Sequence, residues 1–130
     1  MAEAIMNGEL SKRGNFDARA ESCGVMAYEG ASANENAKRA VSKYGYGLDF
    51  HSARRIKSEI VLGSTVFCMD KSLTDCVRAA FPNADVYDLC TYAGVGGAIS
   101  DPYGMGQDAY DRCAEKIRSC ILKILDFEAQ

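Results

Sequence analysis

The sequence predicts a single α/β domain built around a parallel β-sheet. Apolar runs with strand character alternate with runs of helical periodicity along the 130 residues. Length and composition agree with one globular domain, because apolar residues make up 48% of the chain and charged residues 25%. The first element is nevertheless a helix with no strand before it. In such folds the loop between first strand and first helix often binds phosphate, so this start bears on function.

The first half of the chain is expected to be mostly helical. We expect helices over residues 1–13, 32–44 and 52–59, and a strand over residues 16–23. Gly14 and Gly24 end the first helix and the strand, and Gly45 ends the second helix. The short helix over 52–59 would carry three basic residues.

The second half is expected to supply two more strands and two helices. We predict a buried strand over residues 66–69 with 60–62 leading into it, a second strand over 84–89, and a helix over 72–80 that stops at Pro82. The last helix is the clearest element, because its apolar residues form one stripe: Tyr110, Cys113, Ala114, Ile117, Cys120, Ile121, Ile124 and Leu125. About three strands are therefore visible in the sequence.

Charge and hydropathy exclude several classes of function. The net charge is −3 and the basic residues are scattered, which argues against nucleic-acid binding. No apolar run is long enough to cross a bilayer, and the start lacks a signal segment. We therefore expect a cytoplasmic protein that binds no membrane.

The cysteines favour neither a disulfide framework nor a metal site. Six are present, at positions 23, 68, 76, 90, 113 and 120, and none forms a Cys-x-x-Cys pair. His51 is the single histidine, so a Cys/His zinc site is not expected. We expect no metal and no cofactor, and we interpret the cysteines as small buried hydrophobic residues in a reducing compartment.

Asp101 is the most suggestive candidate for chemistry. Pro102 restricts its backbone to an extended conformation, so its carboxylate projects from a loop. Such a group can act as a general acid or base when it faces a pocket. From the spacing alone, an acidic turn that leads into the last helix is the favoured interpretation.

Other candidates are weaker. Tyr28 and Tyr103 stand beside glycines on loops, where aromatic residues either line pockets or anchor the loop. His51 could be a general base, but without an evident partner it fits a structural hydrogen-bonding role better. Residues 94–97 are rich in glycine, yet they lack the nucleotide-binding spacing and no helix follows directly, so a flexible connection is favoured.

Six collinear segments resemble the low-molecular-weight protein tyrosine phosphatase family. They are Met1-Ala2-Glu3-Ala4, Glu21 to Val25 with Tyr28-Glu29, His51-Ser52-Ala53-Arg54, Phe67 to Ser72, Asp101-Pro102-Tyr103-Gly104, and Tyr110 to Cys113. Each motif is modest, but their common order over nearly the whole chain is specific. The resemblance implies a flavodoxin-like, doubly wound parallel sheet of order 2-1-3-4 and hydrolysis of phosphomonoesters through a phosphocysteine.

The resemblance also assigns roles to residues. It implies that Asp101 protonates the leaving oxygen and later activates water, and that Tyr28 and Tyr103 form the walls of the substrate slot. Ser22 and His51 would support the catalytic loop through hydrogen bonds. The expected substrate is a phosphorylated protein.

The chain departs from the family at its catalytic loop. That loop has the pattern Cys-x5-Arg, and no cysteine of this chain is followed by an arginine at the required spacing. We expect an N-terminally truncated family member that lacks the central first strand, with Met1 an internal methionine; a degenerate relative that binds a partner is the alternative. Such a chain would be inactive alone, poorly stable, and prone to self-association through exposed strand edges.

Three other functions stay open. Gly104 stands where many tyrosine phosphatases of the family have a second aromatic residue, and one aromatic residue also occurs in relatives that act on phosphoarginine. A non-catalytic phosphatase-like binding module is another possibility. An arsenate reductase of the same fold is the third, although Cys68 lies inside a predicted strand, ahead of the position where that class has its redox cysteine pair.

Overall fold

The structure is a computed structural model that describes residues 1–24, 33–48, 51 and 53–128. Its elements in chain order are α1 (Ala2–Lys12), α2 (Glu35–Ser42), α3 (Ser58–Val61), β1 (Thr65–Cys68), α4 (Lys71–Ala80), β2 (Asp85–Asp88), α5 (Leu89–Ala93) and α6 (Gln107–Glu128). The expected α/β fold is confirmed. Within these residues, no helix combines the length and apolar character needed to span a bilayer.

The sheet consists of two parallel strands in the described part of the chain. β1 pairs with β2 in a register that places Val66 opposite Val86 and Phe67 opposite Tyr87. β2 lies within the predicted strand 84–89, and β1 is shifted by one residue from the predicted 66–69. Successive residues point to opposite faces, so Val66 and Val86 face α4 while Phe67 and Tyr87 face α5. Helices therefore contact both faces of the sheet.

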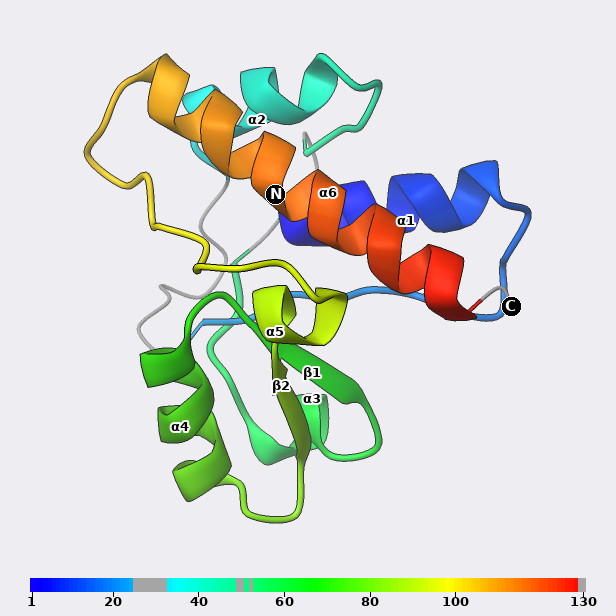
Figure 1. The fold of residues 1–130 in the computed structure, drawn as a ribbon, viewed down its shortest axis with the longest axis vertical. Coiled ribbons are helices and arrows are strands. Elements are labelled where there is room, and N and C mark those ends of the chain that lie inside the picture. The colour runs from blue at the N-terminus through cyan, green and yellow to red at the C-terminus, as the bar shows by residue number, and fades with distance from the viewer. Residues whose placement is uncertain (25–32, 49–50, 52, 129–130) are drawn as a thin grey trace.

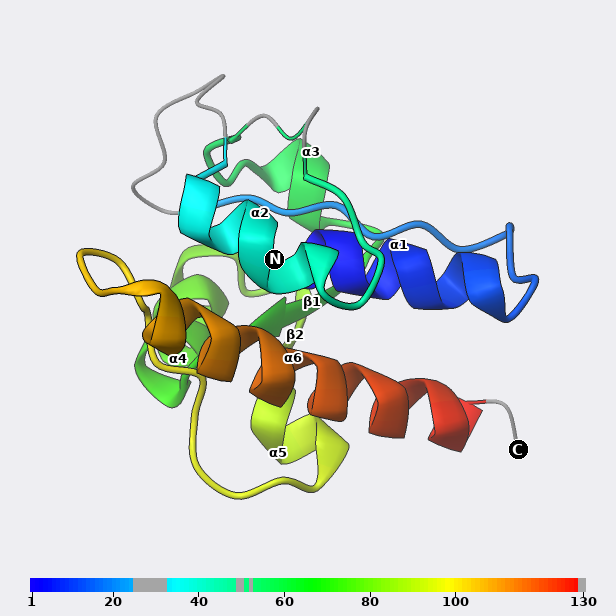
Figure 2. The same ribbon diagram turned by 90° about the horizontal axis from the view of Figure 1, so that it is seen from above.

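A layer of three helices lies above the sheet (Figure 1). α1 and α6 run side by side in the same direction, as Figure 2 shows, and ion pairs join them along their length. Glu9 lies 4.0 Å from Arg118, and Arg13 lies 2.8 Å from Asp126. α2 packs against the first turns of α6, where Lys43 pairs with Asp111.

The last helix forms as its periodicity predicts. All eight residues of the predicted apolar stripe are buried. They face α1, α2 and α5 and form the larger of the two cores, which also contains Ile5, Val41 and Leu89. α2 begins at an Asn34 cap, whose side chain accepts the Asn36 N–H.

The predicted strand over 16–23 is wrong. None of residues 16–23 is in a strand or a bridge, and the next residue, Gly24, makes one isolated bridge to Arg55. Side chains of α1 take the place of a neighbouring strand instead, since Asn7 bonds both backbone polar atoms of Ala20 and Glu3 accepts the Ser22 N–H. An extended segment becomes a strand only where a partner offers matching backbone groups.

The helix predicted over 52–59 is also wrong within the described residues, because 53–57 are not helical and Arg55 takes part in that bridge. A helix of four residues, α3, follows at Ser58–Val61 and includes most of the apolar run 60–62. That run therefore turns toward the core through Val61, which is buried, and does not lead into β1 as a strand. The short helix α5 was not predicted from the sequence.

Candidate functional site

The loop that carries Asp101 connects α5 to α6. The Ile99 N–H donates to the Met69 carbonyl at the end of β1 (3.0 Å), and the Ile99 side chain is buried in the larger core. Two residues later the Asp101 side chain is exposed, and its Oδ1 accepts the Tyr103 N–H at 3.0 Å. As the Asp-Pro pair predicts, the carboxylate projects from a turn and not from a helix.

Asp101 interacts electrostatically with two residues on the first turns of α6. Burial is the largest cause that raises the pKa of Tyr110, and the Asp101 carboxylate raises it further. Burial also raises the pKa of the Cys113 thiol, with a smaller raising contribution from Asp101 and a lowering one from the Met1 amino group. Asp101, Cys113 and the start of α1 therefore belong to one region.

Of the two tyrosines expected to line the substrate slot, the structure describes Tyr103. Tyr103 is 83% exposed and Met105 57% exposed, so the tip of the loop presents two large apolar side chains to solvent. Tyr28 lies outside the described residues. The role of both tyrosines as walls stays a prediction.

Ser22 and His51 meet at Glu3, in the first turn of α1. The Ser22 N–H donates to Glu3 Oε1 at 2.8 Å and the Ser22 hydroxyl at 3.2 Å, while His51 Nδ1 lies 3.3 Å from Glu3 Oε2. Burial alone would raise the pKa of Glu3, but these partners outweigh it and lower the pKa below its usual value. Glu3 is therefore ionised and accepts all three contacts.

Arg54 completes this group, because its Nη2 donates to the Ser22 carbonyl at 3.0 Å and its Nη1 lies 3.5 Å from Glu21. Sequence reasoning missed Glu3 as a functional candidate. An acidic residue in the first turn of a helix is common, because the positive end of the helix dipole stabilises its negative charge. The only signal for Glu3 in the sequence is its place in the first turn of a predicted helix, and that signal is not specific to a functional residue.

Both groups lie near the N-terminus of α1. Glu3 belongs to its first turn, and Cys113 interacts electrostatically with the amino group of Met1, the N-cap residue. Within the described residues, no side chain caps this end. Free backbone N–H groups at a helix N-terminus attract anions, so this end of α1 suits a phosphate group.

Four of the thiols have a pKa shifted away from that of a nucleophile. Burial raises the pKa of Cys23, Cys68 and Cys113, and it raises that of Cys120 to about 11. Reactive cysteines have low pKa values and lie in electropositive, accessible surroundings. Four cysteines are buried, as the sequence predicts: Cys68, Cys90, Cys113 and Cys120. Cys23 is half-buried and Cys76 is exposed.

The described residues were also searched for a metal site and for a cavity that could bind a ligand. No cluster of His, Cys, Asp or Glu in the described residues could hold a metal ion. A cavity of about 240 Å³ opens beside α2 and is lined by Glu35, Lys38, Arg39, Ser42, Tyr46, Gly47 and Leu48. None of the predicted site residues lines it.

The chain matches a known protein family in sequence and solved structures in fold. The sequence matches the family model of the low molecular weight phosphotyrosine protein phosphatases over residues 1–128. The structure is similar to the low molecular weight protein tyrosine phosphatase from T. tengcongensis, with a TM-score of 0.90 and 28% identity over 97% of this chain and 88% of that chain. No curated protein sequence matches significantly.

Two more distant structures share the fold. The YwlE arginine phosphatase from Geobacillus stearothermophilus gives a TM-score of 0.87 at 23% identity, over 98% of this chain and 82% of that chain. The amsI tyrosine phosphatase from Erwinia amylovora gives 0.85 at 21% identity, over 97% and 82%.

Proposed function

This chain belongs to the low molecular weight phosphotyrosine protein phosphatase family, and we propose that within it Asp101 is the general acid for hydrolysis of phosphotyrosine in a protein substrate. The observation that carries the proposal is the placement of Asp101. Its carboxylate projects from a turn and interacts electrostatically with the Cys113 thiol, whose pKa it raises. Cys113 also interacts with the Met1 amino group, at the N-terminus of α1. A phosphate bound at that terminus would have an acid at its edge.

The proposed reaction has two steps. A cysteine thiolate attacks phosphorus and the bond to the tyrosine oxygen breaks, while Asp101 donates its proton to that oxygen. Asp101 then takes a proton from water, which attacks the phosphocysteine and releases phosphate and the thiolate. The acid thus returns to its starting state.

The nucleophile must come from a Cys-x5-Arg loop, a pattern that the 130 residues do not contain. The raised pKa values of the buried thiols support this step, because a thiol that stays protonated does not replace that nucleophile. We therefore propose that these residues alone do not hydrolyse phosphotyrosine. They supply the acid, the exposed Tyr103 as a wall of the substrate slot, and the Ser22–Glu3–His51 group as support for the phosphate loop.

Phosphoarginine is a second candidate substrate. The similarity to the YwlE arginine phosphatase favours it, and the exposed loop carries one aromatic residue, Tyr103, followed by Gly104. Both substrates are tested in the same experiment.

The test uses an extended protein, in which a β-strand and a Cys-x5-Arg loop are fused in frame before Met1. We expect hydrolysis of a phosphotyrosine peptide by the extended protein and none by the 130 residues alone. Asp101→Asn should lower kcat by about 10²- to 10⁴-fold. Asp108→Asn, an exposed residue on α6, is the control.

Each outcome decides between the functions. Faster turnover of phosphoarginine than of phosphotyrosine would replace the proposed substrate. Absence of both activities in a folded extended protein would favour a binding module. Full activity of Asp101→Asn would refute the role of Asp101.

A further inference from the structure

The loop that carries Asp101 is attached to α6 at its start. Lys116 Nζ donates to the Ala98 carbonyl at 2.8 Å, three residues before Asp101. The same Nζ packs against Gly97, where an added Cβ would lie 2.9 Å from it. Gly97 has a φ of +82°, so this close approach and the backbone conformation both favour glycine. Lys116 thus holds the segment that leads into the acid.

The loop is attached again at its end, where α6 begins. Gln107 Nε2 donates to the Asn36 carbonyl of α2 and to Asp111 Oδ1, each at 2.9 Å. Asp111 is in turn paired with Lys43 at the end of α2, a contact that lowers the pKa of the Asp111 carboxyl. The Gln107 side chain therefore ties the start of α6, where the loop ends, to α2.

Ile99, next to Ala98, is held by its bond to the Met69 carbonyl and by the larger core, and the tip from Asp101 to Met105 beyond it makes local contacts. The hydrogen bond described for the Asp101 carboxylate is to the Tyr103 N–H, in the same turn. The Met105 N–H likewise donates to the Pro102 carbonyl. Because bonds inside the tip cannot fix it relative to the rest of the protein, the position of Asp101 depends on the two ends of the loop.

We infer that Lys116 and Gln107 are positioning residues for Asp101, holding the acid loop at its start and at its end. The inference rests on the proposed function of Asp101. Proton transfer requires the acid within hydrogen-bond reach of the leaving oxygen, and a displacement of about 1 Å can cost 10²-fold in rate. Neither residue needs to touch the substrate for this effect.

The experiment measures kcat and KM of the extended protein on two substrates. Phenyl phosphate has a poor leaving group that needs a proton, whereas p-nitrophenyl phosphate has a good one that needs it less. We expect Lys116→Met and Gln107→Met to lower kcat/KM about 10-fold on phenyl phosphate and less on p-nitrophenyl phosphate. The ratio kcat/KM reports the step in which the leaving group departs, whereas kcat also contains the hydrolysis of the phosphocysteine, which is the same for both substrates. Lys116→Arg should restore the rate.

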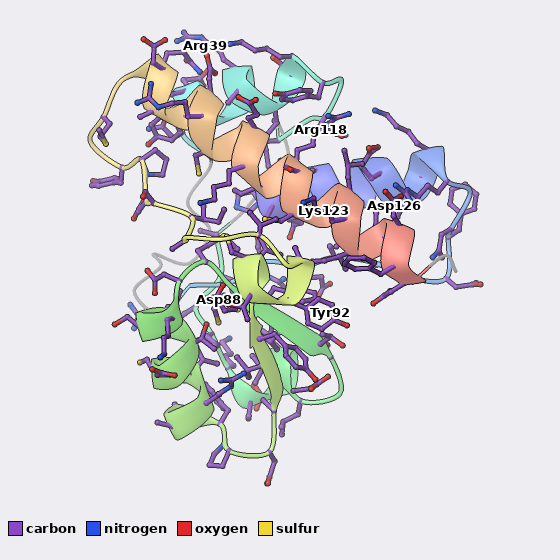
Figure 3. The ribbon with its side chains drawn as sticks, viewed as in Figure 1. Arg39, Asp88, Tyr92, Arg118, Lys123 and Asp126 are labelled. Carbon is purple, nitrogen blue, oxygen red and sulfur yellow. The ribbon has the colours of Figure 1, made fainter. Side chains whose placement is uncertain are left out.

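Lys123→Met is the matched control, because Lys123 is an exposed lysine on α6, two turns beyond Lys116 (Figure 3). We expect it to leave both rates unchanged. Thermal melts of all variants, together with hydrogen exchange across residues 95–106, separate a displaced loop from a general loss of stability.

Double mutants test whether Lys116 and Gln107 affect the rate through Asp101. If Lys116 and Gln107 act through Asp101, each substitution should cost no further activity in the Asp101→Asn background. An equal loss in that background, or an equal loss on both substrates, would overturn the inference and leave the proposed function intact. A silent Asp101→Asn would refute the proposed function and the inference with it.

Discussion

Asn7 on α1 makes with Ala20 the pair of hydrogen bonds that a neighbouring strand would make. Its Nδ2 donates to the Ala20 carbonyl at 2.9 Å, and its Oδ1 accepts the Ala20 N–H at 2.8 Å. Glu3, one turn earlier on the same face of α1, accepts the Ser22 N–H. Two side chains of one helix therefore satisfy alternate residues of an extended segment.

This relationship predicts that Asn7→Ala destabilises the chain. The substitution leaves two partly buried backbone groups of Ala20 without partners, at a cost of about 1–3 kcal/mol in the free energy of unfolding. Urea unfolding measures it. Asn15→Ala is the control, since Asn15 makes an exposed bond to Asp17 within its own turn and should change stability by less than about 0.5 kcal/mol. Equal effects of the two substitutions would contradict the prediction.

The segment from 16 to 23 also shows where sequence analysis fails. Its composition fits a strand, but a strand requires backbone partners that are distant in sequence, and the described chain supplies side chains of α1 instead. The last helix was predictable because its 3.6-residue periodicity is local and all eight residues of its stripe are buried. Self-association through strand edges stays a prediction.

The candidate site divides in the same way. Asp101 could be predicted because Pro102 constrains the backbone next to it, and the structure places its carboxylate on an exposed turn. Glu3 could not, because nothing in the sequence around a first-turn glutamate shows that Ser22 and His51 will meet it. The role of Glu3 depends on contacts with segments that are distant in sequence, and only the folded structure shows those contacts.

Glu3 should make stability depend on pH. Its pKa is lowered in the folded chain, so its contribution is complete above the ordinary glutamate value of about 4.3 and is lost as the pH falls through the folded-state pKa. We expect Glu3→Gln to lower the free energy of unfolding at pH 7 by about 1 kcal/mol, and the difference to shrink at acid pH. Urea titrations at several pH values measure this.

Glu35→Gln is the control for that titration, because Glu35 is exposed and its pair with Lys38 is a surface ion pair of small energy. We expect its substitution to change the free energy of unfolding by less than about 0.5 kcal/mol. A Glu3→Gln deficit that persists unchanged below the folded-state pKa would show that packing, and not charge, is responsible.

Gly8 on α1 is predicted to be intolerant of alanine. A Cβ there would lie 2.2 Å from Tyr46 Cδ1, and the Tyr46 ring is buried. The ring is also held, since its hydroxyl accepts a bond from Arg118 Nε at 3.2 Å and Lys12 lies over its face. Alanine gains about 1 kcal/mol of helix propensity, but overpacking costs about 1–3 kcal/mol, so we expect net destabilisation of up to about 2 kcal/mol.

Thermal unfolding of Gly8→Ala measures this balance. Gly96→Ala is the matched control, because a Cβ at Gly96 would meet open space. We expect the melting temperature to fall for Gly8→Ala and to stay nearly constant for Gly96→Ala. A rise for Gly8→Ala would mean that the Tyr46 ring moves aside at little cost.

The cysteines should differ sharply in reactivity. Burial, followed by the neighbouring Cys90 thiol 3.9 Å away, raises the pKa of Cys120 to about 11. At pH 8 its thiolate fraction would be roughly 10⁻³, against about a quarter for an unperturbed cysteine. Exposed Cys76 should therefore react first with iodoacetamide in the folded chain, and Cys90 and Cys120 should react only after unfolding. Peptide mass spectrometry after timed labelling, with a sample in urea as reference, measures the order. Early labelling of Cys120 would show that α5 and α6 separate readily, since the thiol is reached only when that contact opens.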